Sequence, residues 1–329
     1  MEIMKFENLT ANLIADSVEA KARTAYPDAR FTRGAIEKNN GIWKNALMVQ
    51  VGETSGVQAT LYIDDVTEQV ERGAINVDDA VEELCTTLQF AVHTAPKVSD
   101  VKEKINKANL YVTVVNREAN TERLAHSPHL DIPDTDLSLL ANIRIDDRGS
   151  VRVTNDLCPM LQDTPSAIME QAIRNTNQLG NWQIKSVVET LLEHIDDEIM
   201  RDEMLAMNEA APPMLVITDA RENNAAGMFI NEELRREVAS RLGCESGEGF
   251  YLIPSSVYET LAVPADDFMD AESVKQLVMS VNEEQVPAEQ RLSDNVYYCD
   301  AESLKITMAT GAETIAETKT QTASIAMTI

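Results

Sequence analysis

The chain has 329 residues, with 55 acidic against 28 basic side chains and a formal net charge of −27. Hydrophobic residues make up 44% of it and charged residues 25%, which is typical of a folded protein and excludes a disordered one. Because so negative a chain repels phosphate backbones and anionic lipid headgroups, we expect no direct contact with nucleic acid or membrane. A basic protein partner is compatible with this charge.

The cysteines indicate a reducing compartment. All four stand singly, with no C-x-x-C pair and no spacing typical of a disulfide framework. The N-terminal stretch MEIMKFENLTANLIADSVEA carries acids throughout and lacks the apolar core of a secretory signal. No apolar run is long enough to span a bilayer. We therefore expect a cytoplasmic protein.

An N-terminal lobe is predicted over residues 1–108. It begins with an amphipathic helix at about 5–25, where apolar residues recur at steps of three and four. Three strands follow as a meander, and Asn40-Gly41 in the first turn supplies the positive φ of a hairpin. Two helices complete the lobe, and the second is predicted to begin after Asn76, a good N-cap residue. The strands are expected at 30–38, 43–51 and 57–63.

A larger lobe is predicted over residues 109–309. A strand at 110–116 and a hairpin at 137–155 open it, and helical sequence then extends with breaks over about 156–208. Thr164 is expected to cap one helix, because Pro165 suits a first helical position, where its missing N–H does no harm.

The rest of this lobe reads as strand, strand, helix, twice over. Asn231 is expected to cap the first of these helices, which ends at Gly243, and Asp270 the second. A looser third copy is suggested at 137–162, although residue identity between the copies is negligible. The strands are expected at 214–218, 226–230, 250–254 and 259–264, with two closing strands at 296–299 and 304–308.

The fold class that follows is α+β, with antiparallel hairpins and meanders and with helices packed on one face of the sheet. A single sheet continuing through both lobes is the main alternative. Residues 310–329 are rich in Thr and Ala and are expected to form a flexible tail.

Two serines stand at a corner between predicted strands, in the stretch GFYLIPSSVYETLAVP. A serine nucleophile on a strand end needs small neighbours, as in G-x-S-x-G, and this turn contains no glycine. Pro254 ends the strand because it lacks an N–H, and serine side chains can bond their own backbone in a turn. We expect Ser255 and Ser256 to turn the chain and not to catalyse a reaction.

The best candidate for a metal site is the stretch HSPHLDIPDTD, with His126, His129 and Asp131. Two imidazoles three residues apart plus a carboxylate suit zinc or iron. Pro128 and Pro133 predict a loop there, and a polar connection between elements is the competing interpretation. The sequence has no phosphate-binding glycine motif and no calcium-binding loop of the EF-hand type, so no cofactor is expected.

Three stretches together resemble a known family: ATLYIDDVTEQVERGAINVDDAVEEL, MLVITDARENNAAGMFINEELRREVASRLG with FYLIPSSVYETLAVP, and VNEEQVPAEQRLSDNVYYCDAESLKI. This is an uncharacterised bacterial family of cytosolic proteins, a domain of unknown function found mostly in anaerobic Gram-positive gut bacteria. The resemblance spans most of residues 1–306 and is weakest between about 117 and 210. It implies compartment and origin and supplies no catalytic residue.

Two functional hypotheses follow. The first is a non-enzymatic cytosolic binding or accessory protein, whose strongly acidic surface steers a basic protein partner. The alternative is a metal-dependent hydrolase that uses the loop with His126, His129 and Asp131. The sequence assigns no reaction, ligand or oligomeric state.

Overall fold

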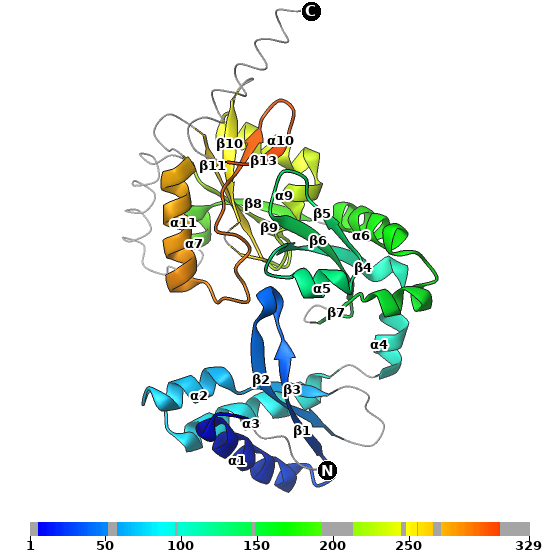
Figure 1. Ribbon diagram of the computed structural model, residues 1–329, viewed down its shortest axis with the longest axis vertical. Coiled ribbons are helices and arrows are strands. Elements are labelled where there is room, and N and C mark those ends of the chain that lie inside the picture. The colour runs from blue at the N-terminus through cyan, green and yellow to red at the C-terminus, as the bar shows by residue number, and fades with distance from the viewer. Residues whose placement is uncertain are drawn as a thin grey trace, which may run out of the picture. The chain divides into compact units, whose positions relative to one another are not determined.

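The computed structural model describes residues 6–51, 58–95, 98–146, 149–179, 181–192, 213–244, 248–254, 256–265 and 271–309. The chain divides into two compact units, Met1–Ile105 and Asn106–Ile329 (Figure 1). The sequence predicts a boundary near residue 108. The predicted tail, residues 310–329, lies outside the described residues. The described strands form three antiparallel sheets, so the α+β class is confirmed and no one sheet serves both units.

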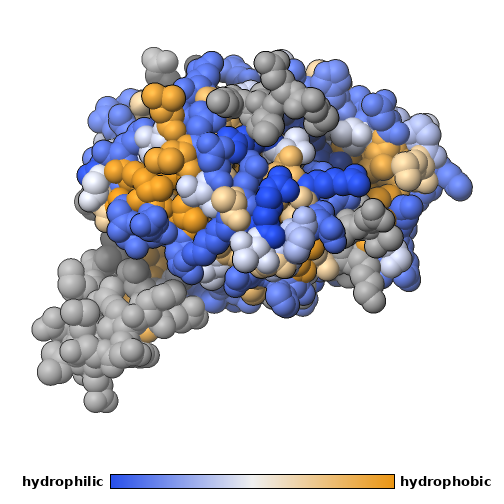
Figure 2. Space-filling view, turned by 90° about the horizontal axis from the view of Figure 1, so that it is seen from below, coloured by the Kyte–Doolittle hydropathy of each residue, from blue (hydrophilic) through white to orange (hydrophobic). Residues whose placement is uncertain are grey.

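The face drawn in Figure 2 is largely hydrophilic, with hydrophobic side chains gathered in smaller patches. Carboxylates such as Asp78 and Glu83 are exposed. No helix in the described ranges is long and apolar enough to cross a bilayer.

Unit 1 contains the predicted meander. Its sheet has the order β1-β2-β3, and all neighbouring strands pair antiparallel. In the first turn, Asn40 and Gly41 take φ values of 60° and 65°, which confirms the role expected of Asn-Gly. The strands are β1 (Arg30–Glu37), β2 (Trp43–Gln50) and β3 (Ala59–Tyr62).

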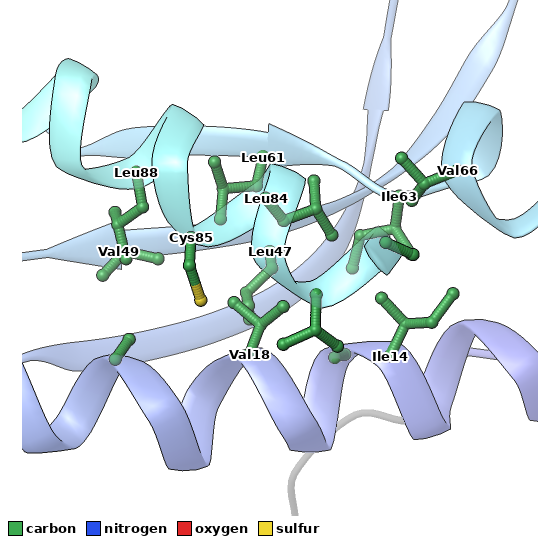
Figure 3. Close-up of a cluster of buried hydrophobic side chains, with 14 of the residues drawn as sticks. Ile14, Val18, Leu47, Val49, Leu61, Ile63, Val66, Leu84, Cys85 and Leu88 are labelled. Atoms are coloured by element: carbon green, nitrogen blue, oxygen red, sulfur yellow. The ribbon is translucent and has the colours of Figure 1, made fainter. Parts of the chain in front are cut away.

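Helices bury one face of this sheet. The Asn8 side chain caps the first helix by accepting from the Ala11 N–H, and Asn76 caps the third as predicted, by accepting from the Asp79 N–H. Ile14 and Val18 of α1 meet Leu47 and Leu84 in a single buried cluster (Figure 3). The helices of unit 1 are α1 (Leu9–Ala25), α2 (Asp64–Glu71), α3 (Val77–Thr94) and α4 (Val98–Lys104).

A buried arginine fastens α1 to the sheet. Arg33 of β1 is 5% exposed, and its guanidinium donates to Glu19 at 2.7 and 2.9 Å and to Asp16 at 2.5 Å. Burial lowers the pKa of this guanidinium, but the hydrogen bonds to Asp16 and Glu19 outweigh it, and the net shift is upward. Arg33 therefore stays charged inside unit 1.

Unit 2 contains two sheets. The larger has the order β13-β12-β10-β11-β9-β8, and the smaller has β6 at its centre, paired with β4, β5 and β7. The larger sheet consists of β8 (Trp182–Ser186), β9 (Leu215–Asp219), β10 (Gly249–Ile253), β11 (Thr260–Pro264), β12 (Tyr297–Asp300) and β13 (Ile306–Met308). The smaller consists of β4 (Leu110–Asn116), β5 (His129–Asp131), β6 (Leu137–Arg144) and β7 (Ser150–Arg152).

The central strands of the larger sheet, β9 and β10, are buried on both faces, whereas the sequence predicts helices on one face of the sheet. Tyr251 and Ile253 of β10 pack with α11 in one apolar cluster, while Phe250 and Leu252, which alternate with them, are also fully buried. The helices of unit 2 are α5 (Thr121–Ala125), α6 (Pro165–Leu179), α7 (Val187–Leu192), α9 (Gly227–Ile230), α10 (Glu232–Leu242) and α11 (Ala271–Gln285).

Two predicted elements are wrong. Residues 182–186 lie within the stretch expected to be helical over about 156–208, yet they form β8, which pairs with β9. Residues 226–230, expected as a strand, instead contain the short helix α9. Brief apolar runs do not separate strand from helix by periodicity, and partners distant in sequence decide. The first strand-strand-helix copy is therefore strand-helix-helix, and the predicted repeat is wrong.

The expected helix ends agree better with the structure. The Thr164 hydroxyl accepts from the Ala167 N–H at the start of α6, as predicted. The Asn231 side chain caps α10, and Gly243 ends that helix with φ 73°. Asp270, the cap predicted for α11, lies outside the described residues.

One carboxylate links the two sheets of unit 2. Asp136, just before β6, accepts hydrogen bonds from the Asn116 amide, Ser293 hydroxyl, Asn295 amide and Tyr297 hydroxyl. Burial, reinforced by the charge of Asp136, raises the pKa of the Tyr297 hydroxyl, which therefore stays a donor. The acidic segment before β6 thus has a structural role.

We predict that Asp136→Ala destabilises unit 2 by about 3 kcal/mol, because several partly buried donors lose a charged acceptor. Urea unfolding followed by Trp182 fluorescence in a Trp43→Phe background measures this, since the chain has 2 tryptophans. The control is Asp134→Asn in the same segment, where the ion pair with Lys305 is exposed and contributes at most about 1 kcal/mol. Equal midpoints for the two variants would contradict the assignment.

Candidate functional site

The candidate site lies at the edge of β4 that no described strand covers. On this edge the Val112 N–H donates to the Thr176 hydroxyl, and the Val112 carbonyl accepts from the Asn224 amide at 2.9 Å. The Asn175 amide donates to the Leu110 carbonyl, also at 2.9 Å. Side chains therefore satisfy the backbone groups that a further strand would otherwise pair.

The edge of the larger sheet supplies the opposite wall. Trp182 of β8 and Asp219 of β9 are direct partners in the strand register. The indole lies so close to Gly227 that a Cβ there would be 2.6 Å from its ring, so glycine is needed at this position. Asp219 is 7% exposed, and its Oδ1 accepts from the backbone N–H groups of Arg221 and Asn223, which shapes the turn after β9.

Between these edges lies a cavity of about 260 Å³, and all of its lining residues belong to unit 2. Five of the described lining residues carry a charge or an aromatic ring, and these determine which ligands the cavity can bind. They are Tyr111, Arg144, Trp182, Asp219 and Arg221. The cavity therefore combines cationic, anionic and aromatic groups.

Arg144 is the least satisfied of the charged groups. Its guanidinium stacks over the Tyr111 ring, 4.6 Å from the centroid, and within the described ranges it makes no hydrogen bond or ion pair. Stacking of this kind leaves the planar N–H donors available for a carboxylate or phosphate. The Trp182 Nε1 donor is buried and likewise has no hydrogen-bond partner.

The lining is made of a few polar, charged and aromatic side chains. Among the described residues that line the cavity there is no histidine, cysteine, serine, lysine or glutamate. Its one hydroxyl on an aliphatic side chain, that of Thr176, donates to the Ala172 carbonyl and accepts from Val112, so no base activates it. The cavity therefore presents hydrogen-bond donors, the Asp219 carboxylate and the aromatic rings of Tyr111 and Trp182.

A protein-family model matches residues 6–301, and it describes a family of unknown function, DUF5688. The chain belongs to this family. The resemblance to an uncharacterised family is thereby confirmed, and the bacterial origin stays a prediction. No curated protein and no solved structure matches the chain. The site in this family member must therefore be interpreted from its own geometry.

The residues predicted to bind a metal do not converge. Residues 129–131 form strand β5, where a loop is expected, because they pair with β6. The Asp131 carboxylate is engaged by Arg117 at 3.1 Å and by the Ser138 hydroxyl at 2.7 Å, and His129 donates through Nδ1 to the Ser127 carbonyl. His126 is exposed at the end of α5. Among the described residues, no three His, Cys, Asp or Glu side chains are grouped to hold a metal.

The serine corner behaves as a turn. Ser256 is buried, and its hydroxyl accepts from the Tyr258 N–H at 3.1 Å, so the expected backbone bond is confirmed for this residue. Ser255 lies outside the described residues.

Sequence reasoning missed the residues of the cavity. Arg144 and Asp219 each end an apolar strand, and a charged residue directly after such a run is a usable signal. Trp182 was hidden because its strand was assigned to a helix. The convergence of these three depends on pairing between distant segments, which the local pattern does not contain.

The cysteines are structural thiols by their surroundings. Cys85, Cys158 and Cys299 are buried, and Cys244 is half-buried. Burial raises the pKa of all four, to about 11 for Cys244 and about 12 for Cys299. None is therefore poised as a thiolate nucleophile near neutral pH.

We predict that Cys244, the most accessible thiol, reacts with a disulfide reagent at pH 8 about 100-fold more slowly in the native protein than in urea, where its ordinary pKa returns. Stopped-flow absorbance with Ellman's reagent measures the rates, and Cys244→Ser identifies the signal. A native thiol that reacts as fast as free cysteine would reveal an activated nucleophile and contradict this assignment.

Proposed function

We propose that the protein is a non-enzymatic binding protein of the bacterial cytoplasm, and that the cavity of unit 2 binds a small organic anion. The observation that carries this proposal is Arg144, a half-buried arginine that lines the cavity and makes no ion pair with any described residue. In a chain with 55 acidic side chains, carboxylates are abundant as partners. An arginine kept apart from them is suited to an external oxyanion.

The proposed ligand is of metabolite size. Pockets for drug-sized ligands are about 300–1,000 Å³, and this cavity is slightly smaller. Tyr111 holds the guanidinium plane from one side and Trp182 adds a further aromatic surface. Because the Arg144 side chain is already held in place, it loses little conformational entropy when a ligand binds, and this favours affinity in a small site.

A hydrolase that uses His126, His129 and Asp131 is the weaker alternative. The Asp131 carboxylate already pairs with Arg117 and Ser138, so a metal would have to displace both. The lining residues that the structure describes include no base and nucleophile pair either. Binding is therefore the function that the geometry favours.

The cytoplasmic location rests on the thiols. All four cysteines are free, and a reducing compartment keeps thiols in this state. The large negative charge keeps such a protein soluble and is compatible with steering a basic protein partner. In unit 1, exposed carboxylates from α2 and α3 provide part of that field, among them Asp65, Glu68, Asp78 and Glu83.

The cavity proposal is tested with 3-phenylpropionate as the probe. In a Trp43→Phe protein, Trp182 is the remaining tryptophan, and we expect the probe to change its fluorescence. Arg144→Gln is expected to weaken binding about 10-fold or more, because a charged bidentate hydrogen bond is lost.

The matched control is Arg174→Gln, which removes an exposed arginine of α6 that pairs with Glu170 and does not line the cavity. It should leave the affinity unchanged. Equal affinity in Arg144→Gln and the parent, or no response up to about 10 mM probe, would refute anion binding at Arg144.

A separate prediction concerns the partner. Affinity capture from a bacterial lysate is expected to enrich a basic protein at low salt that is released at high salt, because exposed charges are screened over about 8–10 Å at physiological ionic strength. Quantitative mass spectrometry at the two salt concentrations measures this. If no basic protein is enriched at low salt and released at high salt, the partner proposal is wrong. The cavity proposal is not affected by that result.

A further inference from the structure

The cavity of unit 2 contains the Asp219 carboxylate and the Arg144 guanidinium, and the described part of the chain gives no partner to one oxygen of the first or to the N–H groups of the second. Because these two groups of opposite charge line one cavity, we infer that the ligand is a small zwitterion of the amino-acid class. Its carboxylate binds Arg144 and its ammonium binds Asp219. The inference rests on the proposed anion-binding function and narrows it to one class of ligand. It depends on the state of each charged group that lines the cavity.

Asp219 is held but not saturated. Its Oδ1 accepts from two backbone N–H groups, at 2.9 Å from Asn223 and 3.3 Å from Arg221, which fixes the carboxylate in one orientation. The described residues give Oδ2 no hydrogen bond. With the residue 7% exposed, this oxygen lacks both a protein donor and full access to water. A mostly buried carboxylate with one such oxygen is stabilised by a cationic donor from a ligand.

Arg144 lacks a hydrogen-bond acceptor among the described residues, as Oδ2 of Asp219 lacks a donor. Its guanidinium is stacked over Tyr111, and no acceptor from the described chain reaches its N–H groups. The two residues come from different sheets, Arg144 from the end of β6 and Asp219 from the end of β9, yet both line the same cavity. One molecule in the cavity can therefore meet both.

The charges of Arg144 and Asp219 disfavour ligands that carry only one sign of charge. A ligand with only an anionic group would leave the Asp219 oxygen facing it without a donor, and a ligand with only a cationic group would face Arg144. A zwitterion pairs each group with its opposite charge. The Trp182 ring lines the same cavity and adds aromatic surface beside these two charges.

The size of the cavity and its aromatic wall point to a single amino acid. About 260 Å³ is below the range of drug-sized ligands and suits a molecule as small as one amino acid. Tyr111 and Trp182 supply apolar surface next to the charged groups. A flat, apolar side chain on the amino acid is favoured by such surface.

The test compares three probes of one shape on the Trp43→Phe protein, with Trp182 fluorescence as the signal and calorimetry as a second readout. L-Phenylalanine has both charges, 3-phenylpropionate lacks the ammonium, and phenethylamine lacks the carboxylate. We expect phenylalanine to bind at least about 10-fold more tightly than either analogue, since each analogue loses one charged hydrogen bond.

Two variants locate the effect. Asp219→Asn keeps an oxygen for the backbone N–H groups and should reduce phenylalanine binding about 10-fold while leaving 3-phenylpropionate unchanged or tighter. Arg144→Gln should weaken both ligands that carry a carboxylate. Thermal unfolding checks that each variant folds, and the three-probe comparison on the parent protein decides the question even if a variant does not.

The outcomes separate this inference from the function on which it rests. If 3-phenylpropionate binds as tightly as phenylalanine, and Arg144→Gln abolishes both, the anion site stands and the zwitterion is wrong. If phenethylamine binds best, Arg144 does not select the ligand and both proposals fail. If none of the three binds up to about 10 mM, both proposals fail as well.

Discussion

The architecture of unit 2 depends on how the open edge of β4 is hydrogen-bonded. A strand edge with unpaired N–H and C=O groups must be paired, covered or capped, because each buried unsatisfied group costs about 1–3 kcal/mol. Here side chains from three positions cap it: Asn175, Thr176 and Asn224. A further strand at this edge would have merged the two sheets. Capping by short polar side chains instead leaves polar space between them, and the cavity occupies that space.

The second link between the sheets has a different character. Asp136 gathers donors from β4, β12 and the segment before β12 around one carboxylate, with Tyr297 among them. Hydrogen bonds to a charged acceptor contribute about 1.5–3 kcal/mol each, more than the neutral bonds at the β4 edge. The firmer junction therefore lies at Asp136, where every donor has its partner. The cavity, by contrast, contains charged groups whose partners are incomplete.

Local sequence signals account for much of the fold. Asn40-Gly41, Asn76, Asn231 and Gly243 each act through their own backbone or through a neighbour within one turn, so their effect can be predicted without the rest of the chain. The wrong predictions arise where distant partners decide. Trp182 is in a strand because β9 pairs with it, and the helix at 227–230 packs its Gly227 against that same indole.

The candidate site was hidden for the same reason. Arg144 and Asp219 are 75 positions apart in the printed sequence and reach one cavity through two separate sheets. In the other direction, the suggestive cluster of His126, His129 and Asp131 is close in sequence but is drawn into a strand and an ion pair with Arg117. Proximity along the chain predicts caps and turns well, but it does not predict which side chains remain without partners in the fold.

The net charge of −27 and the unpaired arginine also constrain the ligand together. A negative protein field opposes the approach of an anion, although salt screens that field beyond about 8–10 Å. Within the cavity, the field of Arg144 acts at short range and favours an oxyanion at one position. A molecule that carries an oxyanion but no net charge meets little of the long-range repulsion and still satisfies the local guanidinium. The acidic surface and the guanidinium in the cavity are therefore compatible when the ligand is a zwitterion, and the Asp219 oxygen that has no donor among the described residues supplies the matching site for its positive end.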